Sequence, residues 1–543
     1  MQQVEVQRAE GYDRRWWILA VLCLSLLIIV MDNTILNVAL PTLVRKLKAS
    51  ESQLQWMVDS YTLLFAGLLL TMGNLGDKFG RRSTLGIGLA IFAVGSAMSS
   101  FAGSPGQLIA TRAVMGVGAA LIMPATLSIL TNVFPPEERA KAIGIWAGIS
   151  GVAIALGPVI GGFLLVHYWW GSIFLINVPV CILALVVGRM IIPNSRDLDA
   201  QRLDPVGAGL SIVGLVALVY GIIEAPGKGW SSPSIIGSLA VAAVVLTSFV
   251  LWELHSDHPM LNVQFFKNPR FTAANMSITL VFFALFGSIF FLTQYLQFVL
   301  GYTALQAGLR LAPMALVLMV VAPLAGQLVA KVGTKAMVAA GMAIGAGGLW
   351  YLSQTAPASG YWHVLGGLVI IAAGLSMSMV PATESIMGSL PPGKAGVGSA
   401  MNDTTREVGG ALGVAILGTV LTSHYSTAIA KAFGALPAPL VAAAKSSVGG
   451  AIAVGQSIGG QVGQALVAVA KSTFITSMGS SLKIAAIVAL GGSVISAIWL
   501  PNRPRHEGGH QAARDAELEP VGTEAAMVEE LAAEEFAAGG VEP

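Results

Sequence analysis

The chain has 543 residues, of which 55% are hydrophobic and only 11% are Asp, Glu, Lys or Arg. Soluble globular proteins carry about 25% charged residues, so this composition excludes a soluble enzyme and a disordered scaffold. The formal net charge of +2 does not provide the clustered basic surface that nucleic-acid binding requires. A mean hydropathy of +0.75 and 63 glycines indicate an integral membrane protein whose helices pack closely.

Fourteen stretches are long and apolar enough to cross a hydrocarbon core of about 30 Å as helices. They comprise residues 16–40, 54–75, 84–101, 107–131, 140–166, 171–192, 205–224, 233–254, 271–299, 306–330, 334–353, 362–388, 396–423 and 477–500. We therefore expect an all-α membrane fold.

The positions of Lys and Arg orient these stretches. When residues 1–15 are placed in the cytoplasm, most of the basic loops also fall there, as the positive-inside rule requires. The exception is the basic segment 45–48. An even number of spans returns the chain to the cytoplasm, so we expect a cell-membrane protein with both termini inside. Residues 501–543 are acidic and rich in Ala and Gly, which predicts a disordered tail.

Residues 424–476 lie between the last two predicted spans and are rich in small side chains. Lys431, Lys445 and Lys471 interrupt this segment. The interruptions favour a compact external hairpin over a further pair of spanning helices.

The loop after the second stretch reads GNLGDKFGRRSTL, residues 73–85. Gly73 permits close helix approach, Asp77 can pair with an Arg or a helix N-terminus, and Gly80 allows a tight turn before Arg81. This pattern resembles the signature loop of the major facilitator superfamily. The resemblance implies two six-helix bundles that rock about a central cavity.

Two further motifs are similar to those of the same superfamily. Arg112, in ATRAVMGVGAA, matches its buried arginine, and an arginine within a span is expected to face a partner or an aqueous cavity. The sequence GVAIALGPVIGG, residues 151–162, resembles the motif of its exporters, in which the helix bend seals the cytoplasmic side against leak. The glycines and proline that carry this match are Gly157, Pro158, Gly161 and Gly162.

The number of stretches and the sequence MDNTILNVALP at 31–41 resemble the fourteen-helix drug:proton antiporters, the DHA2 group to which the exporters QacA, EmrB and LfrA belong. Further matches are WMVDSY at 56–61, FLINVP at 174–179 and AGVGSAMNDTTREVGGALG at 395–413. The resemblance covers about residues 15–500. It implies a six-helix bundle at 16–192, two inserted helices at 205–254 and a second six-helix bundle at 271–500.

Asp32 is an ionisable residue deep within the first stretch, where an uncompensated charge is costly. Burial favours the neutral form of a carboxyl group, which lets it take up and release protons near neutral pH. The resemblance supports Asp32 as the proton site. The alternative is a carboxylate satisfied by Asn33, Thr34 or a neighbouring helix.

Asp403, Arg406 and Glu407 share one face of the thirteenth stretch, with spacings of three and four residues. Arg406 can hold one carboxylate ionised and leave the other free to take up a proton. By resemblance to QacA, Asp403 and Glu407 match two acidic positions, whereas Asn402 stands where that exporter has a further acid. If both acids are only structural partners, coupling rests on Asp32 alone.

Seven other side chains are candidates for contact with a substrate. Asp59 with Trp56 and Tyr61 suits a lipophilic cation, although the two aromatic residues equally fit a membrane-interface belt. Glu384 lies within an apolar stretch after Pro381 and is expected to line the cavity. Tyr295 is a weaker candidate, as are Gln294 and Gln297.

We therefore expect a proton-coupled multidrug antiporter that exports lipophilic, cationic compounds by alternating access. The proton gradient is its expected energy source, and it is expected to act as a monomer among membrane lipids. The sequence contains no metal-ligand spacing, no Walker-type loop and no nucleophile–base arrangement, so we expect neither metal, cofactor nor enzymatic activity. The alternatives are an exporter of lipids or of an endogenous natural product and, less favoured, a non-transporting membrane sensor.

Overall fold

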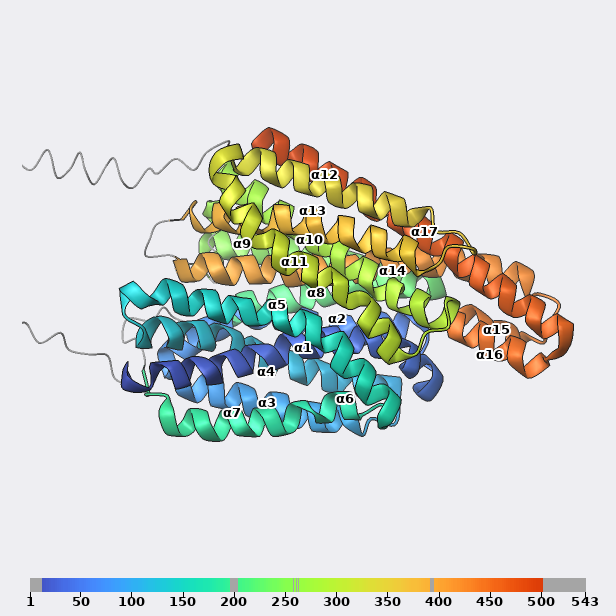
Figure 1. Cartoon of the computed structure of the whole chain (residues 1–543), viewed down its shortest axis with the longest axis horizontal. Helices are drawn as coiled ribbons and strands as arrows, with labels where there is room; N and C mark the ends of the chain where they lie inside the picture. The colour runs from blue at the N-terminus through green and yellow to red at the C-terminus, as the bar shows by residue number, and fades with distance from the viewer. Residues whose placement is uncertain are drawn as a thin grey trace, which may run out of the picture. The chain divides into compact units, whose positions relative to one another are not determined.

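Long apolar helices make up most of the computed structural model (Figure 1). The model describes residues 12–195, 204–256, 258–259, 261, 263–390 and 395–501. The predicted disordered tail lies outside these residues except for Pro501, and so does the side chain of Asp77.

Seven helices come from the first part of the chain. They are α1 (Arg15–Leu47), α2 (Glu51–Phe79), α3 (Arg81–Ser100), α4 (Pro105–Val133), α5 (Pro136–His167), α6 (Ser172–Leu175) and α7 (Asn177–Ile191), preceded by the 3-10 turn η1 (Tyr12–Arg14). Ser50 begins α2 with a capping box: its hydroxyl accepts from the Gln53 N–H, and its own N–H donates to the Gln53 side chain. The sixth predicted span is divided at Ile176 into α6 and α7.

The second part of the chain begins with helices that have proline in the first turn, where a missing N–H costs nothing. The elements are α8 (Pro205–Lys228), α9 (Pro233–His255), η2 (Val263–Lys267), α10 (Pro269–Gln294), the π-helical turn η3 (Tyr295–Val299), α11 (Ala304–Val332), α12 (Thr334–Ser353), α13 (Tyr361–Met387), α14 (Ala395–Ala432), α15 (Ala438–Ser446), α16 (Val448–Ile458) and α17 (Gly460–Trp499).

The helices form two halves. In the N-half, α1 packs on α5 and α7, while α4 packs on α2 and α3. In the C-half, α10 packs on α14 and α17, and α12 packs on α13 and α17. The halves meet where α5 lies along α11, where α2 lies along α14 and where α1 approaches α10. The inserted helix α8 contacts α2, α14 and α9, so it lies beside one of these junctions.

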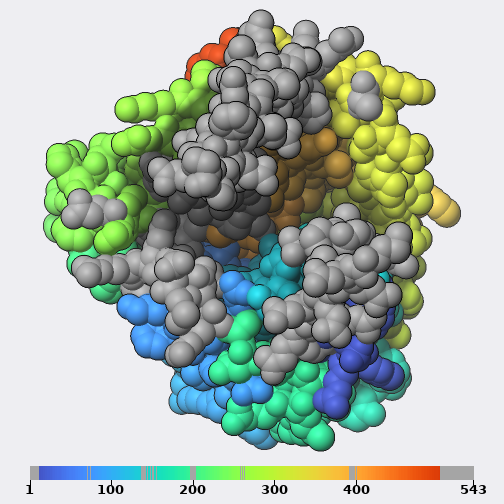
Figure 2. Space-filling model, turned by 90° about the vertical axis from the view of Figure 1, so that its left-hand side faces the viewer, coloured from blue at the N-terminus to red at the C-terminus, as the bar shows by residue number. Residues whose placement is uncertain are grey.

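Helix direction defines two ends of this assembly. At one end, the termini end, the described chain begins with Tyr12 and stops at Pro501. At the opposite end, the hairpin end, the chain turns from α1 into α2, and helices α15 and α16 are found there (Figure 1). Figure 2 views the termini end, with the N-half below and the C-half above.

The segment 424–476 is helical throughout most of its length. It contains the last turns of α14, all of α15 and α16, and the first part of α17. Helix α16 packs on α15, α17 and α1. A methyl group on Gly449 of α16 would lie 2.7 Å from both Phe298 and Val44, so this segment contacts both halves. Its predicted external location stays a prediction.

Twelve helices in the described residues are long and apolar enough to cross a membrane. The predicted count of fourteen is not confirmed, because α2 and α5 do not enter this set. Helix α2 is 29 residues long and α5 is 32 residues long.

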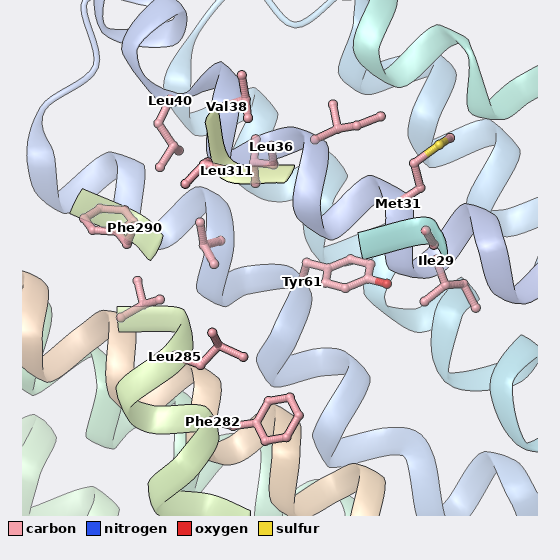
Figure 3. Packing of buried hydrophobic residues seen from close by; sticks show 14 of the residues in the cluster. Ile29, Met31, Leu36, Val38, Leu40, Tyr61, Phe282, Leu285, Phe290 and Leu311 are labelled. Carbon is pink, nitrogen blue, oxygen red and sulfur yellow. The ribbon is translucent and has the colours of Figure 1, made fainter. Parts of the chain in front are cut away.

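A continuous apolar core joins the two halves. Its buried members include Met31 and Val38 of α1 and Phe282 and Phe290 of α10, all of which Figure 3 shows. Burial on this scale fixes α1 against α10 and positions the polar side chains that the core surrounds.

Candidate functional site

An ion pair between Asp32 of α1 and Arg112 of α4 lies at the centre of the N-half. The exposed fraction is 1% for Asp32 and 0% for Arg112. One guanidinium nitrogen contacts a carboxylate oxygen of Asp32, and Arg112 Nε donates to the Met57 carbonyl at 3.1 Å. A buried charge requires such a partner. The predicted proton site and the predicted buried arginine are therefore brought together in one cluster.

Asn177 is the second partner of Asp32. Its amide nitrogen donates to Asp32 Oδ1 at 2.8 Å and to Ser96 Oγ at 3.0 Å. Asn177 is the first residue of α7, directly after the interruption at Ile176, and its side chain is fully buried. The motif FLINVP contains this residue, but a lone amide in an apolar run does not by itself mark a functional position.

Tyr61 of α2 lies against the same cluster. The Arg112 guanidinium carbon is 4.4 Å from the centre of the Tyr61 ring, a cation–π distance. The Tyr61 side chain is buried, and its hydroxyl, which Figure 3 shows pointing to the side of Ile29 and Met31, has no hydrogen-bond partner among the described residues. Tyr61 is therefore an interior residue rather than a member of an interface belt.

The two other members of the WMVDSY motif lie in different surroundings. Asp59 is fully buried, and neither carboxylate oxygen has a hydrogen-bond partner within the described part of the chain. Trp56 is directed toward α8, where its indole nitrogen donates to Glu224 at 3.3 Å and its ring lies 6.3 Å from that of Tyr220. The motif therefore does not form a single aromatic pocket.

A second acidic cluster lies on α14 in the C-half. Asp403 and Arg406 form an ion pair at 3.6 Å, and Arg406 Nη2 lies 3.3 Å from Thr383 Oγ1 of α13. Glu407 Oε2 is buried without a hydrogen-bond partner among the described residues. The two acids have different surroundings: Asp403 has a cation beside it, whereas Glu407 Oε2 has no hydrogen-bond partner among the described residues.

Tyr61 lies between the clusters of the two halves. It is close enough to Asp32 and to Glu407 for the charges of both carboxylates to act on it. Near Tyr61 and Glu407, Leu63 of α2 and Ala411 of α14 belong to one apolar cluster at the junction of these helices. Acidic groups from both halves thus face a common central region.

The exporter-type motif of α5 lies close to two neighbouring helices. A methyl group on Gly162 would lie 2.5 Å from the Leu305 Cα of α11, and one on Gly161 would lie 3.0 Å from Ile35 of α1. Gly157 faces Thr34 just as closely, and Pro158 carries the carbonyl against which Gly308 packs. The glycines therefore allow α5 to touch both α1 and α11.

The loop motif holds the termini end of the N-half. Gly80 adopts a φ of +109°, which favours glycine, and it joins α2 to α3. The Arg81 N–H donates to the Ser195 carbonyl at 3.0 Å, and a methyl group on Gly73 would lie 3.4 Å from Pro124 of α4. The side chain of Asp77 lies outside the described part of the chain, so its predicted role stays a prediction.

Two candidate substrate residues lie away from these clusters. Glu384 is exposed near the termini end of α13. Tyr295 is buried in η3, and its hydroxyl donates to the Ser359 carbonyl at 3.2 Å. Among the described residues, no group of three or more His, Cys, Asp and Glu side chains could hold a metal ion.

Comparison with known proteins identifies the family. The model of the Major Facilitator Superfamily matches residues 22–414. The chain belongs to this superfamily. It is therefore a secondary transporter and a multi-pass membrane protein, and the family expected from the sequence motifs is confirmed.

Two curated relatives match nearly the whole chain. The multidrug efflux pump LfrA of Mycolicibacterium smegmatis is 35% identical over 89% of this chain and 95% of its own length. The tetracenomycin C resistance and export protein of Streptomyces glaucescens is 33% identical over 89% of this chain and 91% of its own.

A crystal structure shares the fold. A bacterial homologue of the human lysosomal transporter Spinster, solved in an inward-facing and unoccupied conformation, aligns with a TM-score of 0.65 at 18% identity, covering 90% of this chain and 98% of that one.

Proposed function

We propose that this member of the superfamily exports lipophilic cations across the cell membrane in exchange for protons. The observation that carries the proposal is the buried Asp32–Arg112–Asn177 cluster beside Tyr61. A carboxylate that is held by one cation and one amide, and is excluded from water, is suited to exchanging its charge for a proton. Relatives named for drug efflux and export support the same direction of transport.

In this mechanism the acids of both halves bind protons and the positive substrate in alternation. Asp32 takes a proton that enters from outside, which neutralises the carboxylate and lowers the affinity of the cavity for a cation. Glu407, with its free oxygen, supplies the negative charge that attracts the cation from the cytoplasm, while Arg406 keeps Asp403 ionised. The proton gradient is the energy source, and no cofactor takes part.

The proposed topology has fourteen spanning helices. Helices α2 and α5 are long enough to cross about 30 Å of hydrocarbon at 1.5 Å per residue. They also pack inside the N-half, against α4 and α1 respectively, so their faces need not be uniformly apolar. The termini end is then cytoplasmic and the hairpin end is external. We propose a monomer, since each chain carries both acidic clusters.

The glycines of α5 act as a moving seal at the hairpin end, whereas the resemblance predicted a seal on the cytoplasmic side. At Gly162 and Gly308 the two halves are in backbone contact toward the hairpin end, which closes the junction of α5 with α11. Rocking of the halves would open this contact and close the termini end.

Cells that express the protein test the proposal. Accumulation of the fluorescent cation ethidium is measured before and after nigericin, which removes the pH gradient, or valinomycin, which removes the membrane potential. We expect wild type to keep ethidium out until nigericin is added, and Asp32→Asn to fail throughout. Efflux that survives nigericin and valinomycin added together would contradict proton exchange, and transport of a labelled lysolipid in place of ethidium would favour the lipid-exporter alternative.

A further inference from the structure

A layer of buried polar side chains lies between the halves at the hairpin end. Glu51 is the first residue of α2 and only 3% exposed. Gln294, at the end of α10 in the other half, donates from Nε2 to Glu51 Oε1 at 2.7 Å. Gln297 of η3 donates to the Val38 carbonyl of α1, also at 2.7 Å. Both hydrogen bonds cross from the C-half to the N-half.

Other atoms of this layer lack partners. The Oε1 atoms of Gln294 and Gln297 have no hydrogen-bond partner among the described residues, and neither does the amide of Gln55, which packs against Gly418 of α14. Buried polar groups without partners are costly, and water would satisfy them if the halves separated. The closed hairpin end is therefore balanced against an open, hydrated state rather than locked by apolar packing.

Glu51 makes this balance sensitive to protons. It precedes the apolar run 54–75, and burial raises the pKa of its carboxyl to about 7 against the opposing effect of the hydrogen bond from Gln294. Its position at the helix N-terminus also favours the ionised form. Once the halves separate and water reaches the group, its pKa returns toward the ordinary value of about 4.3.

The charged and titratable groups around Glu51 have other partners. Tyr425 of α14 lies within its electrostatic reach, and the Tyr425 hydroxyl donates to the Ala444 and Ser447 carbonyls. The guanidinium carbon of Arg45 of α1 lies 5.6 Å from the centre of the Phe298 ring. Lys471 of α17 donates to the Val299 carbonyl at 3.2 Å. The direct partner that the structure gives the Glu51 carboxylate is thus the amide of Gln294.

We propose that Glu51 is a second proton-binding site, separate from Asp32, whose protonation favours closure of the hairpin end because the closed contact with Gln294 buries the carboxyl group. The inference deepens the proposed function, because it assigns a proton to the step that reseals the outer side after the substrate has left. Since the closed state binds the proton more tightly, closure is strongest at low pH and is lost as the pH rises through about 7.

The test measures the distance between the halves at this end without drug or gradient. Spin labels are placed at Lys46→Cys of α1 and Ala358→Cys of the loop before α13, both exposed, in a chain whose Cys23 and Cys181 are replaced by serine. Double electron–electron resonance in lipid nanodiscs reports the closed and open populations from pH 5 to 8. For wild type the ratio of closed to open should rise as the pH falls below about 7, by at most about tenfold per pH unit for one proton.

The Glu51→Gln variant keeps the hydrogen bond but cannot ionise, so its closed fraction should stay high and independent of pH. The exchanged pair Glu51→Gln/Gln294→Glu places the acid on the opposite side of the same contact and should recover the pH response. Gln294→Glu alone places two carboxyls together and should open this end at pH 8. The Glu384→Gln variant, altered at the other end, should behave as wild type.

Asp32→Asn separates this inference from the proposed function. A variant that no longer exchanges protons for drug but keeps the pH-dependent distance change supports a separate site at Glu51. A wild-type response in Glu51→Gln, or a response that disappears only in Asp32→Asn, would overturn the proposal and assign the proton to the central cluster.

Discussion

Arg112 of α4 and Asp32 of α1 contact each other in a region that water does not reach. The two residues are 80 positions apart in the chain, so the pair forms only when the N-half is assembled. An ion pair of this kind is costly to break, because removing either member leaves the other charge buried and alone. Its value to a transporter is that a proton can remove one of the charges during the cycle.

The first prediction concerns the stability of this pair. Arg112→Gln should lower the free energy of unfolding by about 3–5 kcal/mol, and Asp32→Asn by a similar amount, because an arginine cannot shed its proton. The double variant should be more stable than the sum of the two losses implies. Thermal unfolding of the purified protein in one detergent measures all four states of this cycle. Strict additivity would mean that the two residues do not interact.

A second prediction concerns Asn177 as a positioning residue. Asn177→Leu removes the amide that donates to Asp32 Oδ1. The ionised form of Asp32 is then less favoured, so the carboxyl group holds its proton more tightly. The pH profile of ethidium efflux should move to higher pH, while the KM for ethidium should change little. Ser96→Ala, which removes the other partner of the Asn177 amide, should give a smaller shift in the same direction. An unchanged profile with a raised KM would indicate a packing role instead.

Helix α5 offers a matched pair of glycine substitutions. Gly162→Ala places a methyl group 2.5 Å from the Leu305 Cα, whereas Gly148→Ala on the same helix meets no atom within 4 Å. Overpacking typically costs about 1–3 kcal/mol, which corresponds to a loss of closed population of about fivefold to more than a hundredfold. Gly162→Ala should therefore reduce efflux and increase passive proton leak into proteoliposomes, and Gly148→Ala should do neither. Equal activity of the two variants would exclude α5 from the seal.

The α14 acids should differ in their effect on cationic substrates. Glu407→Gln removes a negative charge whose oxygen has no partner among the described residues, so binding of a lipophilic cation should weaken at constant stability. Asp403→Asn instead leaves Arg406 without its carboxylate and should lower both stability and transport. Binding of tetraphenylphosphonium by calorimetry, together with thermal unfolding, distinguishes the two outcomes. Retention of full affinity in Glu407→Gln would remove this residue from the binding site.

Sequence patterns predicted the helices well where apolar runs were long. The predicted stretch 16–40 lies inside α1, and 107–131 lies inside α4. The sequence patterns failed where tertiary packing decides the local structure. Residues 171–192 are mostly apolar, so their periodicity did not indicate the interruption at Ile176 that presents Asn177 to Asp32. The helices within 424–476 were hidden by a composition of small residues and scattered lysines, which is compatible with loops as well as with helices.

Individual site residues were predictable as types but not as partners. The intramembrane positions of Asp32 and Arg112 marked both as functional, yet no sequence pattern pairs residues that are 80 positions apart. Trp56 and Tyr61 belong to one motif, but their positions on α2 place one against α8 and the other against Arg112. Glu51 stands at a helix start where solvent normally satisfies a carboxylate, so only the packed interface with Gln294 identified it.

Exchange of a cation for protons by the purified protein tests the central claim most directly. Proteoliposomes with an acidic interior and a pH-sensitive dye inside receive ethidium from outside, with Asp32→Asn as the paired sample. The account predicts proton efflux on addition of ethidium to wild-type vesicles and none in Asp32→Asn vesicles. Equal proton efflux from both samples, or ethidium uptake with no change of internal pH, would contradict it.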